Sequence, residues 1–124
     1  YVALYDTDKQ HPAYIHGYAD ALVKNDKNPA AVRILRKTLR HYPDTLWAYD
    51  SLAQAYAADG KTMNALFTRA QMLKKMGLFT RTLNLLHQTR SGGYPDASDY
   101  LRASIDDLIK QTEQEKERLD NFKL

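Results

Sequence analysis

The chain has 124 residues, of which 44% are apolar and 27% charged, and this size and mix indicate one folded domain and exclude a disordered polypeptide. Its formal net charge of +3 is spread over interspersed basic and acidic side chains, so we expect no nucleic-acid partner. Cysteine is absent, which excludes disulfides and thiolate metal sites, and no apolar run approaches the ~20 residues of a membrane-spanning helix.

Proline and glycine divide the chain into segments of helical length. Pro12 and Pro29 suit the first turn of a helix, where a missing N–H costs nothing, while Gly60 and Gly77 suit the left-handed residue that ends one. No strand-like alternation is visible, so the sequence predicts an all-α fold of antiparallel helical hairpins. Residues 1–11 are expected to be the end of a preceding element or a linker, in a processed chain or an excised domain. The predicted helices cover 12–25, 29–42, 45–58, 62–76, 79–90 and 96–120.

The first two hairpins repeat at a shift of 34 residues, which is the tetratricopeptide period. Ala19 of the first copy falls on Ala53 of the second, and large residues flank the alanine in both copies. Because only a small side chain fits where two helices come closest, both alanines are predicted to be buried at the hairpin crossings. Residues 12–110 are therefore predicted to form a tetratricopeptide-repeat-like α-solenoid.

The pattern changes after the second copy. Arg69 stands where an apolar residue is expected, and a shift of about half a repeat restores the pattern from Leu66 to Leu86. The segment 62–76 is therefore predicted to serve as the second helix of one hairpin and the first helix of the next. The final helix, with an apolar stripe from Tyr100 to Ile109, is expected to cap the solenoid, and residues 111–124 form its charged end and tail.

Residue types that carry catalytic chemistry lack the spacing that catalysis needs. The histidines show neither His-x3-His nor His-Glu-x-x-His spacing, so we expect no metal site and no cofactor in this chain. No serine stands in a Gly-x-Ser-x-Gly elbow, and the adjacent Asp106 and Asp107 diverge by ~100° on a helix. The sequence therefore predicts that the chain by itself is not an enzyme. The four histidines are His11, His16, His41 and His87.

The order of the elements is more specific than the repeat pattern alone. Two repeats are followed by a half-offset third hairpin and by a helix that begins Tyr100-x-Arg102-Ala103-x-Ile105. The segment 47–61 (WAYDSLAQAYAADGK) is a good tetratricopeptide first helix and turn. Across roughly residues 12–110, this arrangement resembles the C-terminal repeat domain of bacterial periplasmic zinc metallopeptidases, the β-barrel assembly-enhancing protease family.

That resemblance implies a periplasmic location and a module that engages substrates or partners of a protease acting on outer-membrane proteins during assembly. In that family, His-Glu-x-x-His and its zinc lie in a preceding catalytic domain. None of those residues occurs in this chain, so no catalytic or zinc-binding role is implied for it. The implied partners are the outer-membrane assembly machinery or the parent's own catalytic domain.

The repeat register also predicts a protein-binding groove, because the first helix of each tetratricopeptide hairpin lines the concave side of the solenoid. Trp47 and Phe67 would stand exposed among polar side chains, and Asp20 would repel a C-terminal carboxylate. The expected ligand is therefore an extended or helical protein segment with apolar anchors. In a second interpretation, Trp47 packs on the preceding hairpin and Phe67 belongs to the core. The predicted groove residues are His16, Asp20, Lys24, Trp47, Asp50, Gln54, Phe67, Gln71 and Lys74.

Two other functions remain open on the sequence alone. One is a stand-alone tetratricopeptide-repeat adaptor for a peptide or a secretion component, with no protease attached. The other is a helical nucleic-acid-binding or regulatory domain, which retention on heparin or DNA would reveal. The sequence upstream of Tyr1 separates the leading function from the first alternative, because the protease requires a His-Glu-x-x-His domain there.

Overall fold

The computed structural model describes residues 12–92 and 98–122, and every regular element in that part is an α-helix. The all-α prediction is therefore confirmed. The predicted helix limits are correct to within two residues, apart from the start of the last helix, whose predicted residues 96 and 97 lie outside the described part, as do the predictions for 1–11 and 123–124. The helices are α2 (Pro12–Lys24), α3 (Asn28–His41), α4 (Leu46–Ala58), α5 (Thr62–Lys75), α6 (Phe79–Ser91) and α7 (Asp99–Phe122).

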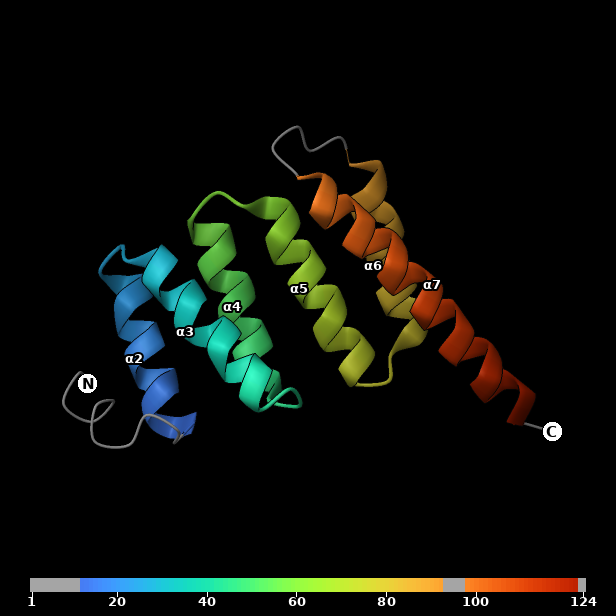
Figure 1. Cartoon of the computed structure of the whole chain (residues 1–124), viewed down its shortest axis with the longest axis horizontal. Coiled ribbons are helices and arrows are strands. Elements are labelled where there is room, and N and C mark those ends of the chain that lie inside the picture. The colour runs from blue at the N-terminus through green and yellow to red at the C-terminus, as the bar shows by residue number, and fades with distance from the viewer. Residues whose placement is uncertain (1–11, 93–97, 123–124) are drawn as a thin grey trace.

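Each helix packs against the next one, so the chain forms a row of antiparallel helices (Figure 1). Two further contacts join alternate helices, since α2 touches α4 and α5 touches α7. Within the described residues, α3 does not touch α5 and α4 does not touch α6. The helices therefore form two groups of three, α2–α4 and α5–α7, which meet where α4 packs along α5.

One type of turn follows α2, α4 and α5. A residue in the left-handed region ends each of these helices, and the N–H after it bonds back to the last turn, as Lys61 N–H does to the Tyr56 carbonyl at 2.9 Å. The left-handed residues are Asp26 (φ 59°), Gly60 (φ 77°) and Gly77 (φ 79°). They lie 34 and then 17 residues apart, so the turn recurs with the repeat and the half repeat found in the sequence.

Small side chains allow the close packing around α4. Ala19 and Ala53 are 1% and 0% exposed, which confirms that both are buried. Helix α4 touches α2, α3 and α5, and it is accordingly apolar on most of its surface. A first hydrophobic cluster joins these four helices around Leu35 and Leu52.

A second hydrophobic cluster joins α5, α6 and α7 around Leu86 and Ile105, which are both fully buried. The apolar stripe predicted for the last helix lies against this cluster, with one correction. Tyr100 is 83% exposed, because the adjacent Leu101 turns inward and Tyr100 points about 100° away from it around the helix. Helix α7 is long but heavily charged, and no helix among the described residues could cross a bilayer.

Five buried threonines complete the two cores, and the hydroxyl of each is hydrogen-bonded. Each hydroxyl donates to the backbone carbonyl four residues earlier, at 2.6–2.9 Å. This local bond removes the cost of burying a hydroxyl, so threonine replaces an apolar residue at these positions. The five are Thr38, Thr68, Thr82, Thr89 and Thr112.

Candidate functional site

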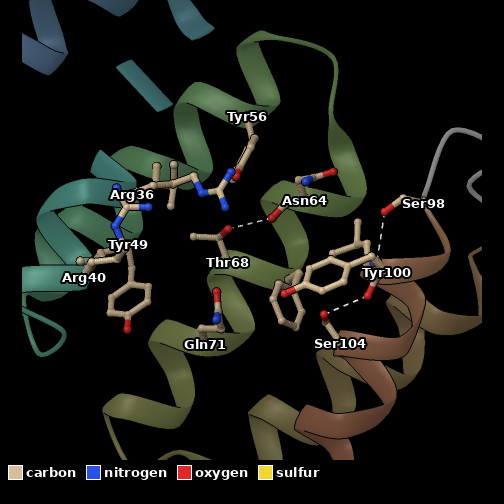
Figure 2. A pocket seen from close by; sticks show the side chains of 14 residues that line it. Arg36, Arg40, Tyr49, Tyr56, Asn64, Thr68, Gln71, Ser98, Tyr100 and Ser104 are labelled. Atoms are coloured by element: carbon tan, nitrogen blue, oxygen red, sulfur yellow. Dashed lines mark hydrogen bonds between the residues drawn. The ribbon is translucent and has the colours of Figure 1, made fainter. Parts of the chain in front are cut away.

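A pocket of about 560 Å³ opens between α3, α4, α5 and α7, and we call it the α3–α7 pocket (Figure 2). Helices α3 and α7 do not touch each other in the described part, so they form opposite walls, and α4 and α5 form the floor. The volume falls in the range of roughly 300–1,000 Å³ that ligand pockets occupy. Its polar and aromatic lining consists of Arg36 and Arg40 on α3, Tyr49 and Tyr56 on α4, Asn64, Phe67, Thr68 and Gln71 on α5, and Ser98, Tyr100 and Ser104 at α7.

Two arginines give this pocket its charge. Arg36 and Arg40 lie one turn apart on α3, and both are exposed. The ion pairs among the described residues all involve other side chains. Helix α3 contains no acidic residue, and no Asp or Glu among residues 12–92 and 98–122 lines the pocket. The two guanidinium groups therefore face the pocket without a carboxylate partner, which favours an anionic ligand.

The floor of the pocket offers hydrogen-bonding groups along α5. Asn64, Thr68 and Gln71 follow one another at helical spacing and all line the pocket (Figure 2). The Thr68 hydroxyl donates to the Asn64 carbonyl at 2.8 Å, so it is already engaged. The side-chain amides of Asn64 and Gln71 bond to no other described residue, so each offers N–H donors and a carbonyl acceptor to a ligand.

The aromatic rings of the pocket differ in exposure. Tyr49 and Tyr56 are only 7% and 9% exposed, so they belong to the packed floor, whereas Tyr100 is 83% exposed on the opposite wall. The Tyr49 hydroxyl donates to the Pro43 carbonyl at 3.0 Å. Burial raises the pKa of Tyr49 above its ordinary 10.0, against the opposing effect of the Lys75 charge. The phenol therefore stays neutral, and Tyr100 is the ring available to a ligand.

A second pocket of about 390 Å³ adjoins the first and shares Tyr49 and Gln71 with it. Its cations are paired within the chain. Lys74 lies 3.3 Å from Glu115 on α7, and Lys75 lies 3.1 Å from Asp44, whose hydrogen bond raises the pKa of Lys75. Both lysines of the second pocket are therefore paired with carboxylates of this chain, whereas the two arginines of the α3–α7 pocket are not.

The nine predicted groove residues fall in two separate places. Those on α2 and α4 form one surface, where the rings of His16 and Trp47 lie with centroids 4.6 Å apart. On the same surface, Asp20 pairs with Lys24 of its own helix at 3.0 Å. Trp47 is half-buried and packs against the first hydrophobic cluster. The contact of Trp47 with His16 joins α4 to α2, whereas the Asp20–Lys24 pair lies within α2.

The other predicted groove residues lie on two different sides of α5. Asp50 accepts a hydrogen bond from Gln54 at 2.9 Å and pairs with Arg69 at 3.6 Å. Phe67 comes two residues before Arg69 and therefore points ~160° away from it around the helix. Half-buried against the second hydrophobic cluster, Phe67 lines the α3–α7 pocket together with Gln71. The structure thus places Phe67, Gln71 and Lys74 at the pockets, and it places the other six on the α2–α4 surface.

Sequence reasoning did not assign Arg36, Arg40 or Asn64 to a binding site, and it placed Tyr100 in the apolar stripe of the last helix. A signal for the arginines is present, because the segment 28–41 contains several basic residues and no acidic one. No such signal exists for Tyr100, since only the path of α7 brings this residue opposite α3.

Within residues 12–92 and 98–122, no three His, Asp or Glu side chains are grouped so that they could hold a metal ion. The described lining of the α3–α7 pocket brings together two guanidinium groups, two side-chain amides, several hydroxyls and an exposed phenol ring. These groups can donate hydrogen bonds to a ligand and pair with an anionic one. Comparison with protein-family models, with curated proteins and with solved structures finds no match to this chain.

Proposed function

We propose that this chain is a protein-interaction module built as a tetratricopeptide-like solenoid of helical hairpins. Two observations support the repeat architecture. The helix-ending turns at Asp26, Gly60 and Gly77 follow the 34-residue period and its half, and the alanines expected at the helix crossings, Ala19 and Ala53, are buried. Hairpins stacked in this way expose long surfaces on which protein segments bind.

The α3–α7 pocket is the observation that carries the binding function. It combines unpaired arginines, unengaged amides and an exposed tyrosine in an open recess of about 560 Å³. Arg and Tyr are the residues that contribute most often to protein-binding hot spots. In the adjoining pocket, by contrast, Lys74 and Lys75 are both paired with carboxylates of this chain.

We extend this proposal to the setting that the sequence resemblance implies. The module is the substrate- or partner-binding domain of a periplasmic zinc metalloprotease that serves outer-membrane protein assembly or quality control. Zinc and the catalytic residues belong to a separate domain. The alternative is a stand-alone adaptor of the same architecture, and the two share the binding surface described above.

Site-specific photo-crosslinking in a bacterial periplasm tests the proposal. A photoreactive phenylalanine replaces Tyr100, whose 83% exposure makes this substitution harmless to the fold. The matched control carries the same group at Arg81, an exposed residue of α6 that lines neither pocket. We expect crosslinks to outer-membrane proteins, to their assembly machinery, or to a metallopeptidase domain at position 100 and not at position 81.

Equal crosslinking at the two positions would refute binding in the pocket. The protease and the adaptor are separated by the sequence encoded upstream of Tyr1. A His-Glu-x-x-His domain there supports the protease, and an upstream region without one supports the adaptor.

A further inference from the structure

We propose that the α3–α7 pocket binds an acidic peptide segment in extended conformation, with carboxylate side chains on Arg36 and Arg40 and an apolar side chain against Tyr100. This inference rests on the proposed function and deepens it by naming the chemistry of the partner.

The charge of the pocket argues for carboxylates. The whole chain has a net charge of only +3, yet the described residues that line this pocket include two arginines and no acidic residue. Two more basic residues, Arg33 and Lys37, are exposed on α3, and neither forms an ion pair within the described part. Helix α3 therefore carries four basic side chains that form no ion pair with any described carboxylate. Arginine binds carboxylates with two parallel hydrogen bonds, which makes it selective for them.

The spacing of the arginines fits alternate residues of an extended chain. Residues four apart on a helix, such as Arg36 and Arg40, are separated by ~6 Å along its axis. In an extended strand, residues two apart are separated by ~6.6 Å and point to the same side. Acidic side chains at alternate positions would therefore each meet one arginine. The residue between them would point to the opposite wall, where Tyr100 is exposed.

The floor of the pocket fits the same ligand. Asn64 and Gln71 are separated by ~10.5 Å along the axis of α5, and three residues of an extended chain span ~10 Å. Both amides are unengaged within the described part and can bond to backbone N–H and C=O groups of a strand. Amide side chains pair with any peptide backbone, so the arginines and Tyr100 would supply the selectivity.

The exposure of the rings favours a peptide over a single-stranded nucleic acid. Nucleic-acid channels stack successive bases on successive exposed aromatic rings. Tyr49 and Tyr56 are less than a tenth exposed and Phe67 is half-buried against the second hydrophobic cluster, so Tyr100 is the one fully exposed ring among the described lining residues.

Fluorescence anisotropy with the whole chain and labelled synthetic peptides tests the inference. The probe is a capped peptide with a central phenylalanine between two aspartates, amidated at its C-terminus. Comparison peptides carry asparagines or lysines in place of the aspartates. A fourth peptide has neutral side chains and a free C-terminal carboxylate, and a labelled oligothymidylate serves as the nucleic-acid probe. The four peptides distinguish binding of side-chain carboxylates from binding of a chain terminus. The oligothymidylate tests whether the pocket binds a nucleic acid instead of a peptide.

We expect the aspartate peptide to bind most tightly and to lose about tenfold in affinity with each arginine removed in Arg36→Gln and Arg40→Gln. The double variant Arg81→Gln/Arg118→Gln removes the same charge from exposed positions that line neither pocket, and it should bind like the parent chain. Tyr100→Ala should weaken binding of the aspartate peptide and leave the helical circular dichroism unchanged.

Three results would overturn the inference. Equal binding of the asparagine peptide, with Tyr100→Ala still weakening it, would refute the acidic preference but leave the protein-binding function intact. Tightest binding of the free-carboxylate peptide would replace an internal acidic segment by a chain terminus. Binding of oligothymidylate with no binding of any peptide would overturn both the inference and the proposed function.

Discussion

Replacing Ala53 by leucine is the sharpest test of the helix packing. Ala53 has no exposed surface and lies on α4, which is enclosed by α2, α3 and α5. Leucine adds three carbon atoms at a place where the neighbouring helices leave no room. Overpacking of this kind costs about 1–3 kcal/mol, because side chains leave their rotamers or helices move apart.

The expected effect on thermal unfolding follows from the size of the chain. For 124 residues the unfolding entropy is about 0.26 kcal/mol/K, so each kcal/mol lowers the thermal midpoint by about 4 °C. Ala53→Leu should therefore lower the midpoint by about 4–12 °C, measured by circular dichroism at 222 nm.

Ala57 supplies the matched control, because it lies one turn later on the same helix and is exposed. Ala57→Leu adds the same atoms in solvent, and its cost should stay below about 0.5 kcal/mol. If Ala53→Leu and Ala57→Leu melted at the same temperature, α4 would not be packed as described, and the close crossing at the repeat alanine would be wrong.

Three further predictions test local features. Asp26→Gly should raise the free energy of unfolding by about 1 kcal/mol in urea titrations, and Gly60→Ala and Gly77→Ala should each lower it by a similar amount, since only glycine adopts the left-handed conformation without steric cost. The opposite sign at any of the three positions would contradict the turn geometry. The raised pKa values of Tyr49 and Lys75 mean that the native state retains protons that the unfolded chain loses, so stability should fall as the pH rises above about 10, and less steeply in Tyr49→Phe. Thermal melts from pH 8 to 11 measure this, and identical slopes for the two proteins would refute the role of Tyr49. Finally, elemental analysis after dialysis should find no stoichiometric zinc, and one retained zinc per chain would contradict the expectation from the histidine spacing.

Sequence alone determined the helices and the residues that end them. Pro29, Gly60 and Gly77 act within one turn of the backbone, so their effect does not depend on distant contacts, and the predicted helix limits agree with the structure to within two residues at these points. The burial of Ala19 and Ala53 could also be predicted, because a repeated small residue indicates a repeated close contact. Asp26 was harder to anticipate, since its left-handed backbone is imposed by the same turn without the usual glycine.

The tertiary structure alone decided which residues share a site. Helical periodicity shows that Phe67 and Arg69 point in different directions, but it does not say which neighbouring helix each of them meets. That depends on α5, which packs on α4 along one side and on α6 and α7 along another. For this reason Phe67 lies in the α3–α7 pocket while Arg69 pairs with Asp50. Tyr100 is exposed in the same pocket because α7 and α3 lie on opposite sides of it and do not touch. The space between two helices that are not in contact leaves no pattern in the residues of either helix.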